Sequence, residues 1–223
     1  RGRVEALFPG WQVDFLAWPA VRATADLREA AAGFIPGEGW IRRPGQGLLS
    51  TRGETSLLPA LGRPWTLPTN LDGQQRIAAR LELRLSEEEG PGLILLTCHG
   101  FHAGLVRPAR GRSLPVLWAP LRGSGERLLE RPATFQEEAW TAWAGGRGGG
   151  CRRLLQGSIY TLELELGPEE GAERLVRFRL DGEELLPAAR IRVPRRGQSL
   201  LEVRLAGTAT ILRVALEGRP VGR

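Results

Sequence analysis

Apolar and polar residues alternate in four segments of the chain. Apolar residues recur at every second position in 77–85, 160–166, 176–180 and 201–205, and mostly arginine, glutamate and threonine stand between them. Because successive side chains of a β-strand point to opposite faces of its sheet, this pattern predicts strands that are buried on one face and solvated on the other. A fifth segment, 92–98, is a nearly continuous apolar run and is also predicted to be a strand.

Turn signals separate these strands from further ones. Pro44–Gly47 is typical of a hairpin turn, Asp181-Gly182 of a two-residue turn, and Ala206–Thr208 of the tip of the last hairpin. The complete set of predicted strands comprises an irregular first strand within residues 1–20, followed by 40–42, 48–50, 56–58, 75–86, 92–98, 101–106, 114–118, 158–166, 174–180, 184–193, 199–205 and 209–217.

One short peripheral helix is predicted at 24–33, because Thr24 could cap its first turn and Gly33 could end it. About a dozen strands without alternating helices exclude a doubly wound α/β fold and predict an all-β sandwich or barrel. We expect a single domain at 38–223, preceded by an N-terminal segment, 1–37, that packs on its core.

The charge pattern favours a solvated surface over a nucleic-acid interface. All 31 basic residues are arginine, the formal net charge is +6, and the arginines are interleaved with 25 acidic residues. Cys98 and Cys151 could form one disulfide or remain two buried thiols, and they lack the four-ligand pattern of structural zinc. The absence of Met indicates a fragment or a processed form, and no apolar run reaches the 18 residues of a membrane span.

Four segments in the C-terminal part of the chain carry a resemblance. They are 159–164 (IYTLEL), 176–183 (VRFRLDGE), 201–207 (LEVRLAG) and 212–218 (LRVALEG). Their order resembles the concanavalin A-like lectin/glucanase superfamily, including its laminin-G-like members, and the segment 39–49 resembles the opening hairpin of that superfamily.

The resemblance spans residues 38–218 and implies a two-sheet antiparallel β-sandwich of the jelly-roll type. Many such domains bind carbohydrate on the concave sheet or in the loops at its rim, others bind proteins, and some are glycoside hydrolases. Similar domains also lie outside the membrane on bacterial sensor proteins, so an extracytoplasmic or secreted location is favoured.

The carboxylates do not match the hydrolase branch. That branch carries Glu-x-Asp-x-x-Glu on one strand, and no segment of this chain has that spacing. Glu163 and Glu165 share a strand face without an intervening Asp and are interpreted as solvated charges. If the chain were nevertheless an enzyme, Glu163, or Glu137 with Glu138, would supply the carboxylates.

The metal-ligand chemistry is sparse. Calcium needs six to eight oxygen ligands, and Asn70 with Asp72 could contribute to one weak site only. His99 and His102 could share a metal only across a turn, and no third ligand is evident. We therefore expect no metal and no cofactor.

The segment 119–153 interrupts the strand pattern and carries the preferred ligand-binding candidates, Trp140, Trp143 and Arg147. Sugar rings stack on aromatic faces, and a guanidinium group donates to hydroxyls or carboxylates. The alternative is that both tryptophans plug an open end of the sandwich. Trp40 and Trp65 are expected in the core.

The sequence thus predicts a non-enzymatic recognition domain that binds carbohydrate or a protein partner through rim loops that include 136–150. A glycoside hydrolase-like enzyme of the same superfamily and a structural or assembly module remain alternatives. Nucleic acid is not an expected partner.

Overall fold

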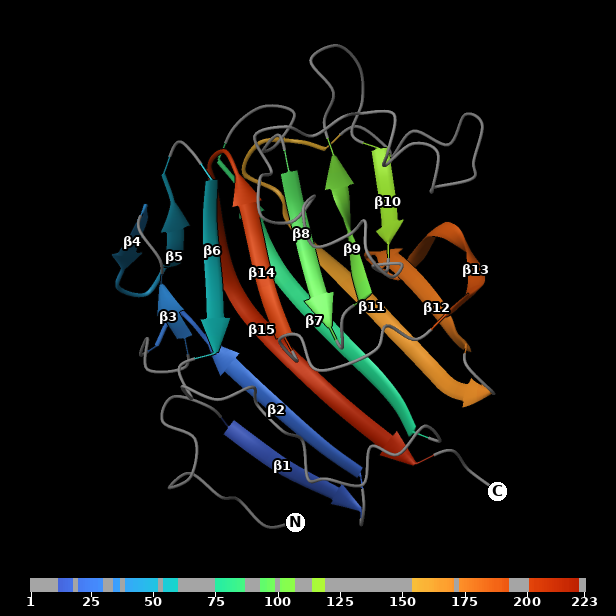
Figure 1. Ribbon diagram of the computed structural model, residues 1–223. Helices are drawn as coiled ribbons and strands as arrows, with labels where there is room; N and C mark the ends of the chain where they lie inside the picture. The colour runs from blue at the N-terminus through green and yellow to red at the C-terminus, as the bar shows by residue number, and fades with distance from the viewer. Residues whose placement is uncertain are drawn as a thin grey trace.

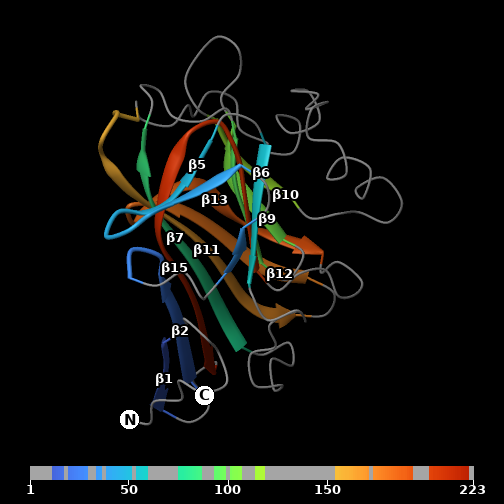
Figure 2. The same ribbon diagram turned by 90° about the vertical axis from the view of Figure 1, so that its left-hand side faces the viewer.

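Alternating side chains produce two antiparallel sheets that pack face to face, as Figure 1 shows from the side of the smaller sheet and Figure 2 from the edge. The computed structural model describes residues 12–17, 20–29, 34–36, 39–51, 54–59, 75–86, 93–98, 101–106, 114–118, 154–170, 173–192 and 201–220. The described residues contain no helix, and hence none long and apolar enough to cross a membrane.

The larger sheet has nine strands and the smaller has six. The order in the larger sheet is β1 (Gln12–Ala17), β2 (Ala20–Asp26), β15 (Ala209–Pro220), β7 (Gln75–Leu85), β11 (Ile159–Glu170), β12 (Glu173–Leu180) and β13 (Glu183–Arg192), with β5 (Gly47–Ser50) also paired to β15 and β4 (Trp40–Arg43) paired to β5. The order in the smaller sheet is β10 (Leu114–Trp118), β9 (Phe101–Val106), β8 (Leu93–Cys98), β14 (Leu201–Ala206), β6 (Glu54–Pro59) and β3 (Phe34–Pro36).

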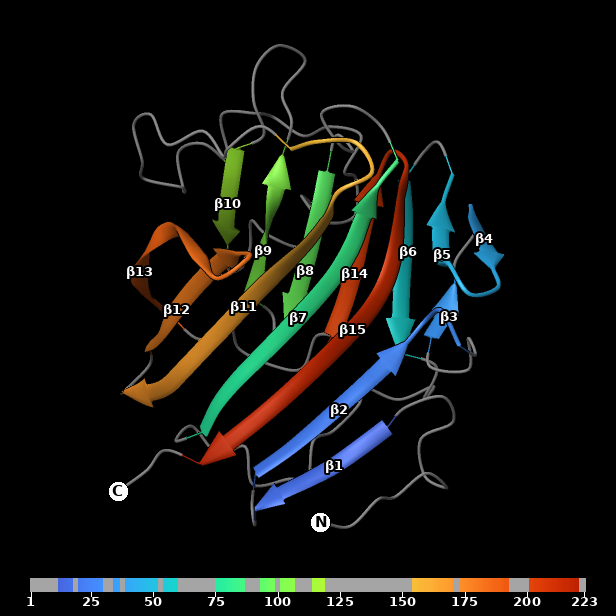
Figure 3. The same ribbon diagram turned by 180° about the vertical axis from the view of Figure 1, so that it is seen from behind.

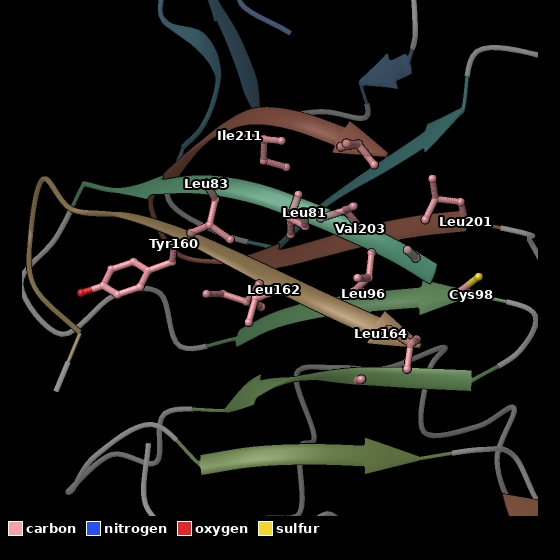
Figure 4. Packing of buried hydrophobic residues seen from close by; sticks show 14 of the residues in the cluster. Leu81, Leu83, Leu96, Cys98, Tyr160, Leu162, Leu164, Leu201, Val203 and Ile211 are labelled. Carbon is pink, nitrogen blue, oxygen red and sulfur yellow. The ribbon is translucent and has the colours of Figure 1, made fainter. Parts of the chain in front are cut away.

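The core lies between the two sheets and consists mainly of leucine. Leu81 and Leu162 of the larger sheet face Leu96 and Val203 of the smaller one, and all four side chains are fully buried (Figure 4). Burying one such side chain contributes about 1.5–3 kcal/mol of transfer free energy. The two-residue period predicted from the sequence therefore corresponds to the alternation between core and outer face.

The predicted all-β sandwich and its strands are confirmed, as are two of the three turns. The hairpin around Pro44–Gly47 joins β4 to β5. At the second turn Asp181 and Gly182 both have positive φ, 51° and 84°, as a type I′ turn requires. The Asp181 carboxylate also accepts a hydrogen bond of 2.7 Å from the backbone N–H of Thr161, which attaches the turn to β11.

The predicted helix at 24–33 is wrong where the structure describes it. Residues 24–26 belong to β2 and residues 27–29 form a turn. Ala23, Ala25 and Leu27 alternate with polar residues and are buried against the core. The two-residue period therefore prevails over the helical propensity of alanine, because pairing with β15 satisfies the backbone of β2.

The predicted last hairpin is also wrong. β14 ends at Ala206 in the smaller sheet and β15 begins at Ala209 in the larger one, so the intervening turn crosses between the layers. Ser50 fixes this crossing, because its hydroxyl donates to the carbonyl of Gly207 (2.9 Å) and accepts from the N–H of Ala209 (2.9 Å).

Candidate functional site

A row of polar residues crosses the outer face of the smaller sheet. Backbone pairing places Glu202 of β14 beside Thr97 of β8, and Thr97 beside His102 of β9. All three alternate with core residues, so their side chains point away from the larger sheet. Their exposed fractions are nevertheless only 8%, 1% and 2%. We call Glu202, Thr97, His102 and the adjacent Arg204 the polar row.

Hydrogen bonds connect the members of the polar row in pairs. Thr97 Oγ1 and His102 Nδ1 share a hydrogen bond of 2.7 Å. Arg204 Nε donates to Glu202 Oε1 at 2.6 Å, two residues along the same strand face. Burying such groups is costly unless they are hydrogen-bonded, so a polar cluster of this kind on a buried sheet face is a candidate binding site.

Burial determines the charge state of the histidine. Desolvation, assisted by the positive charge of Arg204, lowers the pKa of His102 to about 3. The imidazole is therefore neutral near pH 7 and offers one donor and one acceptor nitrogen. The polar row thus combines a hydroxyl, a neutral imidazole and a carboxylate–guanidinium pair.

Gly104 keeps β8 and β9 close together beside the polar row. It pairs with Leu95, one row along from the Thr97–His102 pair. A Cβ atom at this position would lie 2.0 Å from the carbonyl oxygen of Ile94, nearer than any real contact. Only glycine fits here without a shift of the backbone, so the spacing of the two strands that carry Thr97 and His102 depends on it.

The outer face of the larger sheet is chemically different, because its charges neutralise one another across the strands. Glu217 of β15 accepts from Arg22 of β2 (2.8 Å) and from Arg80 of β7 (3.4 Å). Arg80 also binds Glu163 of β11, which in turn accepts from Arg179 of β12 (2.7 Å). The same arrangement continues through Glu165, Arg177, Glu184 and Arg219. We call this set the ion-pair ladder.

The ion-pair ladder corrects the interpretation of Glu163 and Glu165 as simply solvated charges. Both carboxylates are half-buried and lie within 3.4 Å of an arginine nitrogen. Arg80 and Arg179 clasp Glu163 from both neighbouring strands. The Glu163 carboxylate is therefore held by arginines of both neighbouring strands.

Most of the ligand candidates chosen from the sequence lie outside the described residues. These are Trp140, Trp143 and Arg147, together with Glu137, Glu138, His99, Asn70, Asp72, Trp65 and Cys151. Within the described part of the chain, no three His, Cys, Asp or Glu side chains come together as metal ligands. Trp40 packs against the core, as predicted.

Cys98 is a buried free thiol, and desolvation raises its pKa to about 12. Of the two possibilities left open by the sequence, the buried thiol therefore applies to Cys98.

Sequence reasoning missed Thr97, Glu202 and Arg204 as site residues. The alternation in 201–205 is the same as in strands whose polar side is solvated. The apolar run 92–98 was the signal in the sequence that could have found them. A continuous apolar run is typical of a strand that is buried on both faces, and it therefore indicates that the outer face of its sheet is also covered.

Comparison with known proteins gives matches at the level of structure only. No protein-family model matches the sequence, and no curated protein matches it significantly. The carbohydrate recognition domain of Emp46p matches over 86% of this chain and 93% of its own length, with 11% identity and a TM-score of 0.55. The corresponding domain of Emp47p matches over 86% and 92%, with 10% identity and a TM-score of 0.51.

The exoplasmic/lumenal domain of VIP36, in its Ca²⁺/Man3GlcNAc-bound form, matches over 86% of both chains, with 11% identity and a TM-score of 0.50. Coverage this complete at such low identity indicates a shared architecture. The chain therefore has the concanavalin A-like jelly-roll fold of these lectin domains, as the sequence resemblance implied.

Proposed function

We propose that this protein is a carbohydrate-binding domain without enzymatic activity, and that its ligand contacts Glu202 and Arg204, the two members of the polar row whose side chains reach solvent. The observation that carries the proposal is the polar row, a buried set of hydrogen-bonding groups that points away from the core. The shared fold with carbohydrate recognition domains supports the same assignment by analogy.

The chemistry of the polar row suits a ligand rich in hydroxyl groups. Each sugar hydroxyl can donate and accept, and the row contains a carboxylate acceptor, a guanidinium donor and two groups that do both. Because His102 stays neutral, the net charge of the row near pH 7 comes from the Glu202–Arg204 pair and is close to zero. We infer a neutral rather than a highly charged sugar at this position.

Trp140, Trp143 and Arg147 remain our proposed contacts at the rim. Aromatic faces provide the apolar half of sugar recognition, through contact with the C–H edges of the ring, and a buried polar row cannot supply it. The two sets of residues would thus have complementary roles.

The ion pair formed by the Glu202 carboxylate favours binding over hydrolysis at this face. Glycoside hydrolysis requires two carboxyl groups on opposite sides of the scissile bond. On the outer face of the smaller sheet, Glu202 binds Arg204 at 2.6 Å, and the strand register places Glu54 of β6, opposite Ala206, on the same face. A carboxylate held by an arginine is suited to holding a hydroxyl group.

A glycan array followed by titration of the best ligand tests the proposal. Glu202→Gln should weaken binding by about tenfold or more, because a hydrogen bond to a charged group contributes about 1.5–3 kcal/mol. Glu82→Gln makes the same chemical change on the outer face of the larger sheet and should leave affinity unchanged. Unfolding curves of both variants would verify the fold.

The outcomes separate the two parts of the proposal. If no glycan binds the wild-type protein, carbohydrate binding is wrong. If glycan binds equally to wild type and Glu202→Gln, the polar row is not the site. If Trp140→Ala with Trp143→Ala leaves the affinity intact, the rim contacts are wrong while the polar row stands.

The same function favours an extracytoplasmic or secreted location, where free and cell-surface glycans are accessible. Fractionation of cells that produce the natural protein would test this, and recovery in the cytosolic fraction alone would contradict it.

A further inference from the structure

The two central strands of the larger sheet carry several arginines on their outer face. β7 and β15 pair with each other in the middle of that sheet, as Figure 3 shows from the outer side. Arg76, Arg80 and Arg84 recur along β7 at every fourth residue, and Ala78 and Glu82 lie between them. The residues that alternate with this set belong to the core, so all five side chains point outward.

β15 adds two further arginines to the same part of the face. Its register places Arg219 directly opposite Arg76, and Arg213 opposite Glu82. Residues that pair directly across two strands point to the same face of the sheet, so these side chains also point outward. We call Arg76, Arg80, Arg84, Arg213 and Arg219 the arginine stripe.

The arginine stripe is accessible along its whole length. Arg76 and Arg84 are exposed at its two ends, which lie eight residues or about 26 Å apart on β7. The side chains of Arg80, Arg213 and Arg219 are 39%, 45% and 57% exposed. The alanine and the glutamate between the arginines of β7 are half-buried. A ligand that follows β7 therefore meets no buried position among the outward residues.

The glutamates of the two strands do not balance these charges. Glu217 is 4% exposed and already accepts from Arg22, Arg80 and Arg219. Glu82 is the second glutamate, so the outer sides of β7 and β15 carry five arginines and two glutamates. The members of the ion-pair ladder on β11 and β12 are, by contrast, two glutamates and two arginines. The excess positive charge therefore lies on the central pair of strands.

The arrangement of the arginine stripe is unfavourable for the fold alone. Arg76 and Arg219 lie directly opposite each other, and like charges in such positions destabilise a sheet. Arg76 and Arg84 form no ion pair with any described residue. Carboxylate and sulfate groups accept paired hydrogen bonds from a guanidinium group and would neutralise its charge. Charge complementarity thus indicates a ligand that carries several acidic groups.

The dimensions of the arginine stripe match a linear polymer. Two strands have a width of about 10 Å, so the stripe covers roughly 260 Å². A stable protein–protein interface needs roughly 800 Å² on each partner. A folded protein would therefore also have to cover the neutralised ion pairs on either side, whereas an extended chain can follow the stripe alone.

The surroundings of the arginines favour a polysaccharide over a nucleic acid. Proteins that bind single-stranded nucleic acid stack its bases on aromatic side chains, and neither β7 nor β15 contains an aromatic residue. A nucleic-acid duplex carries a charge about every 1.7 Å, whereas the arginines of β7 recur about every 13 Å. Charges are much more widely spaced in a polysaccharide in which acidic and neutral sugar units alternate.

We propose that the arginine stripe binds an acidic polysaccharide through its carboxylate or sulfate groups. The polymer lies along β7 and β15, with acidic groups at Arg76 and Arg84 and a neutral unit over Ala78. This site is independent of the polar row, because the two lie on the outer faces of different sheets. The protein would thus hold two carbohydrates of different charge on opposite sides.

Labelled dextran sulfate and neutral dextran of the same chain length test the proposal with the full chain. Dextran sulfate should bind, with an affinity that falls steeply as salt is added, and neutral dextran should not bind to this face. Combining Arg76→Gln with Arg84→Gln should weaken the binding of dextran sulfate by about tenfold or more, because two charge-assisted contacts are lost. Neither arginine is part of an ion pair with a described residue, so the double variant should keep its fold.

Combining Arg42→Gln with Arg43→Gln gives the matched control. Both arginines are exposed on β4, outside the arginine stripe, and form no ion pair with a described residue. This variant loses the same two charges and should change the affinity by less than about twofold, because salt screens exposed charges that do not contact the ligand. Unfolding curves of both double variants verify their folds.

Three results would overturn the proposal. The first is absence of dextran sulfate binding. The second is an equal loss of affinity in the two double variants, since the charge of the whole protein would then be responsible. The third is tighter binding of oligothymidylate than of dextran sulfate with the same dependence on Arg76 and Arg84, since the ligand would then be a nucleic acid.

The two proposed sites can fail separately. Glu202→Gln should leave the affinity for dextran sulfate unchanged, because Glu202 lies on the other sheet. The double variant of Arg76 and Arg84 should in turn leave the affinity for the glycan selected on the array unchanged.

Discussion

Because His102 is buried, the free energy of unfolding should fall in mild acid, and the size of this loss follows from the pKa of the side chain. An ordinary histidine has a pKa near 6.5, and burial beside Arg204 lowers the pKa of His102 to about 3. Protonation is therefore disfavoured in the folded state, and the full stability is present above pH 6.5. It is lost as the pH falls from 6.5 towards 3, at about 1.4 kcal/mol per pH unit.

At pH 4.5 the contribution amounts to two such units, or about 2.7 kcal/mol of unfolding free energy. Urea unfolding of wild type and His102→Asn at pH 7, 5.5 and 4.5 measures it. Asn keeps a polar atom near Thr97 and cannot titrate, so the variant should lose stability more slowly as the pH falls. Carboxylates such as Glu217 also titrate in this pH range, but both proteins retain them. Subtracting the unfolding free energy of one protein from that of the other at each pH therefore removes their contribution. Parallel pH profiles for the two proteins would refute the argument.

Three further predictions concern the core, the smaller sheet and the ion-pair ladder. In a Cys151→Ser background, Cys98 should react with thiol reagents only as fast as the protein unfolds, because burial raises the pKa of its thiol to about 12. Fast labelling of the native protein would contradict this. Gly104→Ala should lower the free energy of unfolding, measured in urea, by about 2 kcal/mol or more, because the added Cβ would meet the Ile94 carbonyl oxygen. A loss below ~0.5 kcal/mol would disprove the close approach of the two strands. Glu217→Gln should lower the free energy of unfolding by about 1–2 kcal/mol, and this loss should be smaller at high salt because salt screens the ion pairs with Arg22 and Arg80. A loss that does not depend on salt would show that charge pairing is not its cause.

The strands of this protein were predictable because the two-residue period is a local property. Leu162 and Leu164 are separated by one glutamate, and no knowledge of the rest of the chain is needed to place them on one face. The hairpin at Pro44–Gly47 and the turn at Asp181-Gly182 were equally local, since positive φ favours glycine and aspartate.

The errors arose where structure depends on distant partners. Residues 24–26 are ambiguous by themselves, and pairing with β15, almost 190 residues later, makes them a strand. The turn after Ala206 has the composition of a hairpin tip, and only the pairing of β14 and β15 with different strands shows that it joins two sheets.

The polar row could not be predicted for the same reason. Thr97, His102 and Glu202 are assembled by the register of three strands, and register follows from the whole fold. The burial of that face is likewise a tertiary property. The alternating pattern indicated that Glu202 points away from the core, and it could not indicate that the outer face is covered.

The position of β15 has a consequence for how the protein is synthesised. This late strand lies in the middle of the larger sheet, between β7 on one side and the early strands β2 and β5 on the other. The ribosome therefore releases the N-terminal strands well before the neighbour that they require exists, and their unpaired edges must wait for it. A cell that produces this domain needs either rapid completion of the chain or a chaperone that shields those edges, and premature termination before residue 209 would leave the two halves of the larger sheet unjoined.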